Sequence, residues 1–219
     1  MKSTIERLRR ILALLGTCPL SAEVYLAGGT ALLLKYQHRI STDLDLFLLP
    51  GMELNTSFYK GELARISPHF ETIYEASHTL TIGIERTKIS FFEYPYDLLA
   101  ETETLPSVGI KLASDKDIAC MKAVAVAQRG EKKDFYDLWY LMETHDWEID
   151  DLIQMAEKKY PNYNSSILIK ALTYFDDAEN MQEQETVESR WSEIKAFFVN
   201  KVASWKERIS PPRHQGPIR

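Results

Sequence analysis

One short stretch, YLAGGTALLLKYQHRISTDLDLFLLP between Tyr25 and Pro50, restricts the fold of this 219-residue chain more than any other part. An apolar, strand-like run ends at Gly28-Gly29, a helical run follows, and a second strand-like run begins with an Asp-x-Asp pair. A short connection between two such strands usually leaves them next to each other in one sheet. The stretch therefore predicts a mixed region of strands and helices in which a glycine turn and two carboxylates lie on neighbouring strands.

The glycine turn is a candidate phosphate-binding site. Glycine lets the backbone approach a ligand closely, and the free N–H groups at the start of a helix bind phosphate well. We therefore select Gly28, Gly29 and Thr30 as candidate nucleotide-binding residues, with Thr30 as the expected N-cap of the helix. A tight strand-to-helix turn with a threonine cap and no ligand explains the same residues.

Asp43 and Asp45 are candidate metal ligands. Alternate side chains of a strand share a face, so the two carboxylates point the same way and can chelate Mg²⁺. The alternative is that Asp43 caps a turn and Asp45 faces water. Arg39 and Ser41, just before the pair, are candidate substrate contacts, although a solvated helix end explains them as well.

A second group of candidate residues lies in the sequence KAVAVAQRGEKKDFYDLWYL. Lys122 and Arg129 are seven residues apart and share a helix face approximately. Lys133 follows them, and Asp134 and Asp137 share one side of the next helix. A buried lysine–aspartate pair here could bind a triphosphate or orient a metal ligand. Stabilisation of the helix start by an aspartate, together with aromatic packing, is the structural alternative.

Composition limits the classes of partner. A net charge of −6 and a pI of about 5.5 argue against non-specific nucleic-acid binding, but they allow a local basic patch. No apolar run reaches the ~18 residues needed to span a membrane, so no membrane partner is expected. The two cysteines lack metal-type spacing and indicate no disulfide scaffold, which favours a cytoplasmic location.

Residue patterns divide the chain into two halves and a tail. Residues 1–112 mix strand-like and helical runs, and the last two strand-like runs are expected to form a hairpin near Arg86. Amphipathic helical runs dominate residues 113–205, which are expected to form a helical domain packed on the first. The polar, proline-rich residues 206–219 are expected to be a flexible tail.

Together, GGTALLLKYQHRISTDLDLF and DIACMKAVAVAQRGEKKDFYDLWYL resemble the AbiEii/AbiGii-type nucleotidyltransferase family, over roughly residues 20–145. These proteins are toxins of bacterial type IV toxin–antitoxin and abortive-infection systems. The resemblance implies the fold of DNA polymerase β-type nucleotidyltransferases, an α+β fold with a mixed β-sheet, flanking helices and a helical C-terminal half. It also implies a metal site at Asp43 and Asp45, next to the glycine turn.

The resemblance assigns roles to residues further along the chain. The family's downstream lysine falls on Lys122, and its Arg/Lys-Asp-x-x-Asp helix start falls on Lys133, Asp134 and Asp137. Lysine in place of the common arginine keeps the charge but loses the forked geometry. One position departs from the pattern of this fold, because Ser90 stands where a third carboxylate is common.

The implied activity is metal-dependent transfer of a nucleoside monophosphate, with Mg²⁺ or Mn²⁺ and a nucleoside triphosphate (NTP) as substrate. RNA, tRNA in particular, or a protein is the implied acceptor, and an antitoxin encoded nearby is an implied partner. The expected landing site for the acceptor is a basic patch of Lys116, Lys122, Arg129, Lys132 and Lys133. Two alternatives stay open: a catalytically inactive relative that binds a nucleotide or a partner protein, which Ser90 favours, and a phosphotransferase that moves the γ-phosphate.

Overall fold

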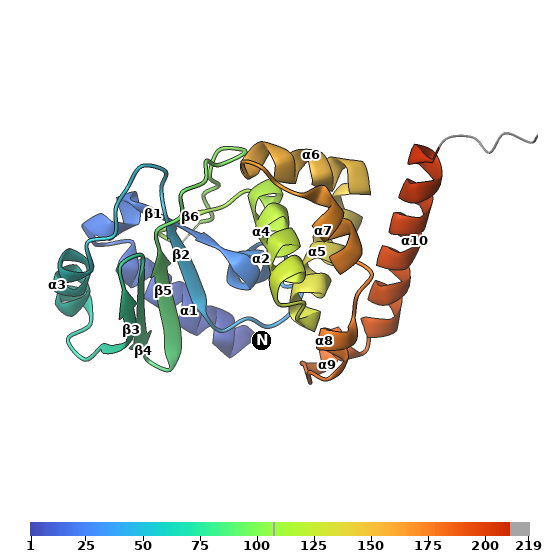
Figure 1. Ribbon diagram of the computed structural model, residues 1–219. Coiled ribbons are helices and arrows are strands. Elements are labelled where there is room, and N and C mark those ends of the chain that lie inside the picture. The colour runs from blue at the N-terminus through green and yellow to red at the C-terminus, as the bar shows by residue number, and fades with distance from the viewer. Residues whose placement is uncertain (107, 211–219) are drawn as a thin grey trace, which may run out of the picture. The chain divides into compact units, whose positions relative to one another are not determined.

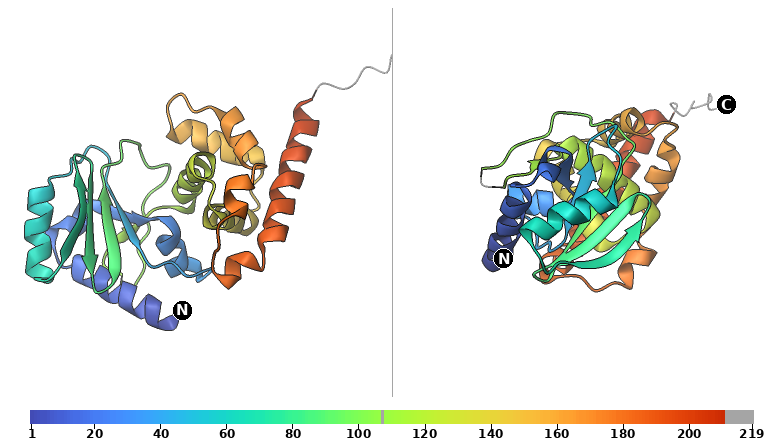
Figure 2. Two further views of the ribbon diagram at one scale, coloured as in Figure 1. Left: turned by 60° about the horizontal axis from the view of Figure 1, so that its bottom comes forward. Right: turned by 90° about the vertical axis from the view of Figure 1, so that its left-hand side faces the viewer.

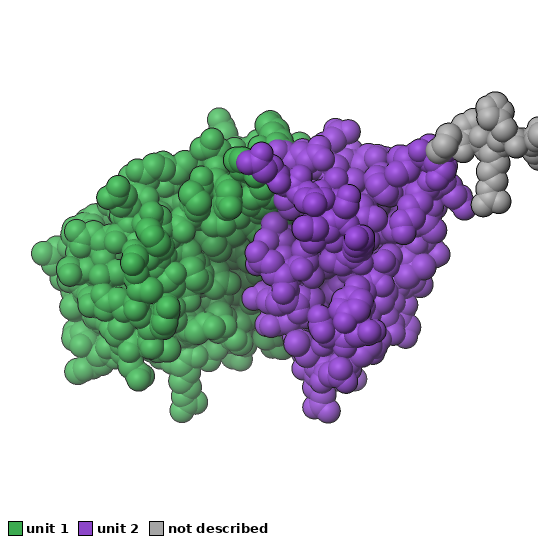
Figure 3. Space-filling view, viewed as in Figure 1, with its two compact units in different colours: residues 1–122, 158–161 green, residues 123–157, 162–219 purple. Residues whose placement is uncertain are grey.

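The computed structural model (Figure 1) describes residues 1–106 and 108–210. The chain forms two compact units, coloured separately in Figure 3. Unit 1 contains Met1–Lys122 and Lys158–Pro161, and unit 2 contains Ala123–Glu157 and the residues from Asn162 onward. The division falls inside helix α4 (Asp115–Gln128), whereas the sequence patterns suggested a change of character at residues 112/113.

Unit 1 is built around a six-stranded mixed sheet with the strand order β3-β4-β5-β2-β1-β6. The strands are β1 (Val24–Ala27), β2 (Leu44–Leu48), β3 (Glu71–Ala76), β4 (Thr79–Ile84), β5 (Thr87–Phe92) and β6 (Lys111–Leu112). β2 is antiparallel to β1 and parallel to β5, while β3, β4 and β5 form an antiparallel meander. β6 pairs in parallel with β1. The predicted mixed sheet is confirmed, with β1 and β2 as neighbours.

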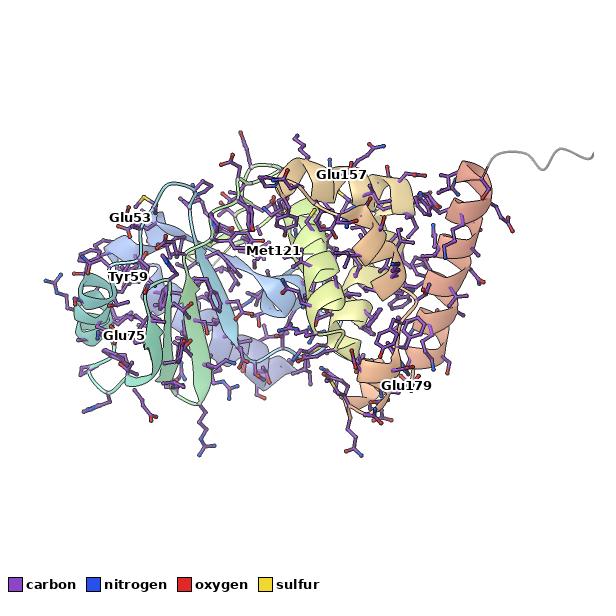
Figure 4. The ribbon with its side chains drawn as sticks, viewed as in Figure 1. Glu53, Tyr59, Glu75, Met121, Glu157 and Glu179 are labelled. Carbon is purple, nitrogen blue, oxygen red and sulfur yellow. The ribbon has the colours of Figure 1, made fainter. Side chains whose placement is uncertain are left out.

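The two faces of this sheet differ in character. Leu44, Leu46 and Leu48 of β2 are buried, whereas the residues between them are half-buried. Helix α3 (Thr56–Ile66) packs on the leucine face, where the ring of Tyr59 meets that of Phe91 at 5.2 Å; Tyr59 is labelled in Figure 4. Helix α1 (Lys2–Leu15) lies against α3. One face of the sheet is therefore core, and Asp45 lies on the other.

The remaining helices of the first half connect the strands. Helix α2 (Gly28–Tyr36) follows β1 directly and packs on β1 and β2. A short 3₁₀ helix, Pro19–Ala22, precedes β1. Two views of these elements are given in Figure 2, in which α2 and α3 lie on opposite sides of the sheet. The chain thus places α2 on the same side of the sheet as the polar residues of β2.

The hairpin expected near Arg86 joins β4 and β5. Ile84 pairs with Thr87, and the two residues between them, Glu85 and Arg86, have φ values of +48° and +64°. Positive φ at both central positions defines a type I′ turn, which usually contains asparagine or glycine. The hairpin is confirmed, but its turn is made by residues that give no turn signal.

Unit 2 is helical. Its elements, after the end of α4, are α5 (Lys132–His145), α6 (Ile149–Lys159), α7 (Ser165–Ala171), α8 (Asp176–Glu179), α9 (Glu185–Glu188) and α10 (Trp191–Ile209). The core forms around Phe135 of α5, whose ring lies 5.4 Å from Phe175, 5.6 Å from Trp191 and 5.7 Å from Phe198, measured between centroids. The aromatic residues of α5 are therefore core, the structural alternative given above.

The tail begins later than residue 206, because α10 continues to Ile209. The last turn of this helix is held by Asp150 of α6, which accepts hydrogen bonds from Trp205 Nε1 at 2.7 Å and from Arg208 Nη2 at 3.0 Å. Arg208 and Trp205 also hold the pKa of Asp150 below its usual range. Residues 211–219 lie outside the described residues.

Both cysteines, Cys18 and Cys120, are free thiols and buried. Burial raises the pKa of both thiols, that of Cys120 to about 12. Neither is part of a disulfide, as expected from their spacing. Within residues 1–106 and 108–210, no helix is long and apolar enough to cross a membrane.

Candidate active site

The glycine turn lies at the junction of β1 and α2. Ala27 is both the last residue of β1 and the N-cap of α2, so the helix begins at Gly28. Gly28 has φ +68°, and a Cβ atom at this position would lie 3.0 Å from Oδ2 of Asp45. A side chain here would be strained and would press on that carboxylate. The start of α2 therefore lies beside one of the two predicted metal ligands.

Gly29 leaves room for the segment that leads into β2. A Cβ atom on Gly29 would collide with Nη2 of Arg39 and would lie 3.2 Å from Oγ of Ser41. Arg39 is only 4% exposed, and its Nη1 donates to the Ile40 carbonyl at 2.9 Å. The structure thus brings Arg39 and Ser41 to the glycine turn, and the solvated helix end considered for Arg39 is wrong because this side chain is buried.

Thr30 lies inside the first turn of α2 and is not its N-cap, which corrects the sequence prediction. Its hydroxyl contacts the Asp43 carbonyl oxygen and, at 2.8 Å, the hydroxyl of Ser41. Because the carbonyl can only accept, Thr30 donates to it and accepts from Ser41. The N-cap is Ala27 and not Thr30, so the helix begins three residues earlier than expected, because Gly28 can adopt a positive φ. Thr30 therefore fixes the backbone of Asp43 to α2.

The two carboxylates lie at the start of β2. Asp43 precedes the strand, and its Oδ2 is 3.1 Å from Nζ of Lys88; the side chains are 46% and 49% exposed. Asp45 is within the strand, level with Ala27 of β1 and with Ser90 of β5. The predicted proximity of the glycine turn and the Asp-x-Asp pair is confirmed. Lys88 was not selected from the sequence, although its position two residues before Ser90 places it on the same strand face.

Ser90 occupies the place beside Asp45 where a third acidic ligand was considered. It is 3% exposed, and its hydroxyl lies 3.1 Å from that of Thr81 on β4. The nearby Glu93 is engaged elsewhere, since it accepts from the Leu54 backbone N–H at 3.2 Å and lies 3.1 Å from His78 Nδ1. His78 and Leu54 hold the pKa of Glu93 below its usual range. Glu93 therefore does not replace the missing carboxylate.

The donor set at this edge of the sheet is two carboxylates. Among residues 1–106 and 108–210, no group of three or more His, Cys, Asp or Glu side chains could hold a metal ion. Mg²⁺ keeps several waters and is commonly bound by one or two carboxylates together with phosphate oxygens of a substrate. Asp43 and Asp45 fit a cation of that kind, whose remaining ligands come from a nucleotide and water.

Lys122 lies on α4, next to Met121, which is labelled in Figure 4, and is 6% exposed. The start of α4 is fixed by Ser114, whose hydroxyl accepts from the Asp117 backbone N–H at 3.1 Å and donates to the Asp117 carboxylate at 2.6 Å. Asp117 also forms an ion pair with Lys159 at 2.7 Å, and both side chains are fully buried. The helix that carries Lys122 is thus firmly anchored in unit 1.

The other predicted residues belong to unit 2. Asp134 is fully buried and accepts two hydrogen bonds from Arg129, from Nε at 2.7 Å and from Nη2 at 3.0 Å. Nζ of Lys133 lies 2.6 Å from Oε2 of Glu131. Asp137 is fully buried on α5. The structure therefore brings Arg129 and Asp134 together as a two-bonded ion pair that joins the end of α4 to the start of α5.

Lys132 does not belong to a basic patch. It is 5% exposed, its ammonium lies 2.9 Å from both carboxylate oxygens of Glu188, and it faces the Trp191 ring at 5.7 Å. The prediction that Lys132 belongs to the landing site for an acceptor is wrong, because its ammonium is paired with Glu188, 56 residues away in sequence.

Solved structures with a similar fold are nucleotidyltransferases and related proteins. MenT4, a nucleotidyltransferase toxin of Mycobacterium tuberculosis, matches with a TM-score of 0.54 and 13% identity, over 97% of this chain and 90% of that one. JHP933 of Helicobacter pylori matches with a TM-score of 0.50 and 16% identity, over 93% of this chain and 94% of that one. Similarity at this level establishes the nucleotidyltransferase-like fold, a mixed sheet followed by a helical half.

Sequence comparison is more specific. A family model described as nucleotidyl transferase AbiEii toxin, type IV toxin–antitoxin system, matches residues 10–91 and 87–209. The chain is also 43% identical over 206 residues to the uncharacterized protein aq_aa25 of Aquifex aeolicus, which covers 94% of this chain and 97% of that protein. The family match includes both motifs singled out above. The chain therefore belongs to the AbiEii family of nucleotidyltransferase toxins from type IV toxin–antitoxin systems.

Proposed function

We propose that this toxin transfers a nucleoside monophosphate from an NTP to the hydroxyl of an RNA acceptor of the tRNA type, with a protein hydroxyl as the alternative acceptor. The observation that carries the proposal is the position of Gly28 beside Asp45, because it places the candidate phosphate-binding turn next to a candidate cation ligand. A triphosphate at the start of α2 would reach both. Membership of a type IV system implies an antitoxin as partner, and its gene is expected nearby.

Residues of unit 1 would bind the triphosphate and the cation. The N–H groups at the start of α2, at Gly28 and Gly29, would bind phosphate oxygens. Asp43 and Asp45 would hold Mg²⁺ or Mn²⁺, and the cation would neutralise charge on the triphosphate and the leaving pyrophosphate. Thr30 would act by fixing the backbone of Asp43, and it would not bind a phosphate of the nucleotide itself.

The chemical step is a displacement at the α-phosphorus. The acceptor hydroxyl oxygen forms a bond to this atom, the bond to the bridging oxygen breaks, and pyrophosphate leaves; the hydroxyl proton passes to water. Lys122 would stabilise the negative charge that develops. Arg39 and Ser41, held against the glycine turn, would contact the substrate from the side of β2.

The second group of residues would serve the acceptor side. Asp134 would act by positioning Arg129, with which it makes two hydrogen bonds. Asp137 would support α5, the helix that carries Asp134. Arg129 and Lys133 are partly exposed, so each could contact acceptor phosphates. Lys116 is exposed on α4, in unit 1, and is a separate candidate contact for the acceptor.

Transfer of a radioactive label tests the proposal. The protein is incubated with Mg²⁺, each α-labelled NTP in turn and total bacterial RNA or lysate. We expect label from one donor to appear on one class of macromolecule. The Asp43→Ala and Asp45→Ala variants should lose this label, because each removes half of the carboxylate pair. Glu53→Ala, a change at an exposed carboxylate labelled in Figure 4, should keep full activity and serves as the matched control.

The same experiment separates the alternatives. Transfer of label from the γ position and not from the α position would identify a phosphotransferase. Binding of a nucleotide without transfer of either label would favour an inactive relative, which Ser90 at the third-ligand position supports. Full activity of both aspartate variants would overturn the role of the pair.

A further inference from the structure

Strand β5 presents an unusual pair of side chains to the active site. Ser90 is level with Asp45 on the neighbouring strand, and Lys88, two residues earlier, points to the same face of the sheet. The ammonium of Lys88 lies 3.1 Å from the Asp43 carboxylate. Along β5 the site therefore contains a cation and a neutral hydroxyl, and no acidic group.

Ser90 is poorly suited to bind a cation. It is neutral and only 3% exposed, and its hydroxyl is hydrogen-bonded to that of Thr81 at 3.1 Å. A ligand role would require this hydroxyl to leave its partner inside the sheet. On β5 and at the start of β2, the negative charge then comes from Asp43 and Asp45.

The formal charges limit how many divalent cations the site can hold. The two carboxylates and the Lys88 ammonium sum to −1 (−1 −1 +1), and the Arg39 guanidinium at the glycine turn reduces the negative charge further. A third carboxylate with no lysine would give −3 before Arg39 is counted. Two divalent cations in a shared site must be bridged and neutralised by several anionic oxygens. Lys88 already occupies one oxygen of Asp43 and brings a single positive charge to that position.

We propose that this active site works with one divalent cation, and that the ammonium of Lys88 takes the place of a second one beside Asp43. The inference rests on the proposed function and specifies the charge arrangement of the same site. Lys88 and Asp43 are both about half exposed, so the ammonium can move between the carboxylate and a substrate phosphate. In that position Lys88 would provide positive charge without adding a metal ligand.

Binding of Mn²⁺, followed by electron paramagnetic resonance, tests the inference without measuring activity. The protein is titrated with Mn²⁺ alone and with each of the four α,β-methylene NTP analogues, which cannot transfer the nucleotide. We expect the unmodified protein to bind one Mn²⁺ per chain with its preferred analogue. Lys88→Ala should bind Mn²⁺ alone about threefold to tenfold more tightly, because a competing charge is removed from Asp43. Lys88→Asp should bind a second Mn²⁺.

Matched controls are available on the same unit. Lys60 is also a partly exposed lysine in an ion pair, 2.8 Å from Glu75, and it lies on α3, which covers the other face of the sheet. Lys60→Ala and Lys60→Asp should leave Mn²⁺ binding unchanged. Because position 88 is exposed, its variants bury no new charge and should fold.

The outcomes distinguish the two proposals. Two Mn²⁺ ions bound by the unmodified protein with a nucleotide analogue would overturn the one-cation site and leave the proposed transferase intact. Lys88 variants that behave like the Lys60 controls would overturn the role of Lys88. Absence of Mn²⁺ binding with every analogue would contradict both the one-cation site and a metal-dependent transferase.

Discussion

At the scale of single residues, the site depends on two glycines that are required for different reasons. Gly28 adopts a positive φ, and a Cβ atom there would press on the Asp45 carboxylate, so both its conformation and its lack of a side chain matter. Gly29 has no unusual φ, and its requirement is purely steric. The guanidinium of Arg39 fills the space that a Cβ would need, and at 4% exposure that group has little freedom to move.

Gly29→Ala should therefore destabilise the protein by about 1–3 kcal/mol, the usual cost of overpacking a buried position. It should also lower nucleotide transfer, because Arg39 and Ser41 are displaced from the turn. Urea unfolding and the label-transfer assay measure the two effects. Gly61→Ala is the control: it lies within α3 with no atom within 4 Å of the added methyl group, and should stabilise by about 0.5–1 kcal/mol. Equal stability of the two variants would contradict the steric argument.

Residue roles that depend on distant partners were the hardest to predict. Lys132 looked like part of a basic patch because its partner Glu188 is 56 residues away in sequence. The contact of Lys88 with Asp43 depends on the register of β2 and β5, which the sequence pattern does not specify. Asp43, Asp45 and the glycines were found because local spacing alone brings them together.

At the scale of elements, α4 carries Lys122 and is anchored by a buried network. Lys159 lies at the end of α6, and its fully buried ammonium bonds to the Asp117 carboxylate at 2.7 Å and to the Asp97 carbonyl at 2.9 Å. The ring of Tyr94 lies 5.5 Å away. Asp117 in addition accepts from the Leu99 backbone N–H at 2.9 Å. One lysine therefore ties α4, the end of α6 and the chain after β5 into unit 1.

Lys159→Met should cost about 3–5 kcal/mol in the free energy of unfolding, because it leaves a buried carboxylate without its counter-charge. Chemical denaturation gives the value directly. Lys60→Met removes a lysine from an exposed pair with Glu75 and should cost less than about 1 kcal/mol. A small effect for both variants would show that the Asp117 carboxylate is stabilised mainly by Ser114 and Leu99.

Most elements were predictable because each has its own hydrophobic period. The mixture of strands and helices in the first half, the β4–β5 hairpin and the helical half follow from such patterns, whereas the α+β class and the mixed sheet were implied by the family resemblance. β6 contains only Lys111 and Leu112 and exists through its pairing with β1, so no local pattern indicates it. The start of α2 was misplaced because Gly28 allows the helix to begin before its threonine. The continuation of α10 to Ile209 depends on contacts with Asp150 in another helix.

At the scale of the whole molecule, the core of unit 1 contains several weakly acidic groups that burial keeps protonated. Burial raises the pKa of Cys120 from 9.0 to about 12 and that of Tyr94 from 10.0 to about 12. Burial also raises the pKa values of Tyr25, Tyr59 and Cys18. These groups lose their protons at a lower pH in the unfolded chain than in the folded protein, so their ionisation favours unfolding as the pH rises.

The free energy of unfolding should therefore fall as the pH rises above about 9. Between pH 9 and 10 the cysteines dominate, because unfolded tyrosines ionise near 10, and each group contributes at most about 1.4 kcal/mol per pH unit. Cys120→Ala should make this slope clearly shallower, whatever its effect on stability at pH 7. Urea unfolding at pH 7, 9, 9.5 and 10 provides the slopes. An unchanged slope in the variant would mean that Cys120 ionises as easily in the folded protein as in the unfolded chain.

The packing of Arg39 against Gly29 also has an evolutionary consequence. A mutation that adds a side chain at position 29 is harmful while a long side chain occupies position 39, and becomes tolerable once position 39 carries a smaller residue. The order of change is therefore fixed, because Arg39 has to be replaced before position 29 can accept a side chain. A lineage that has exchanged Arg39 for a short residue can therefore vary the glycine turn, whereas this chain, which retains both residues, is held to glycine at position 29.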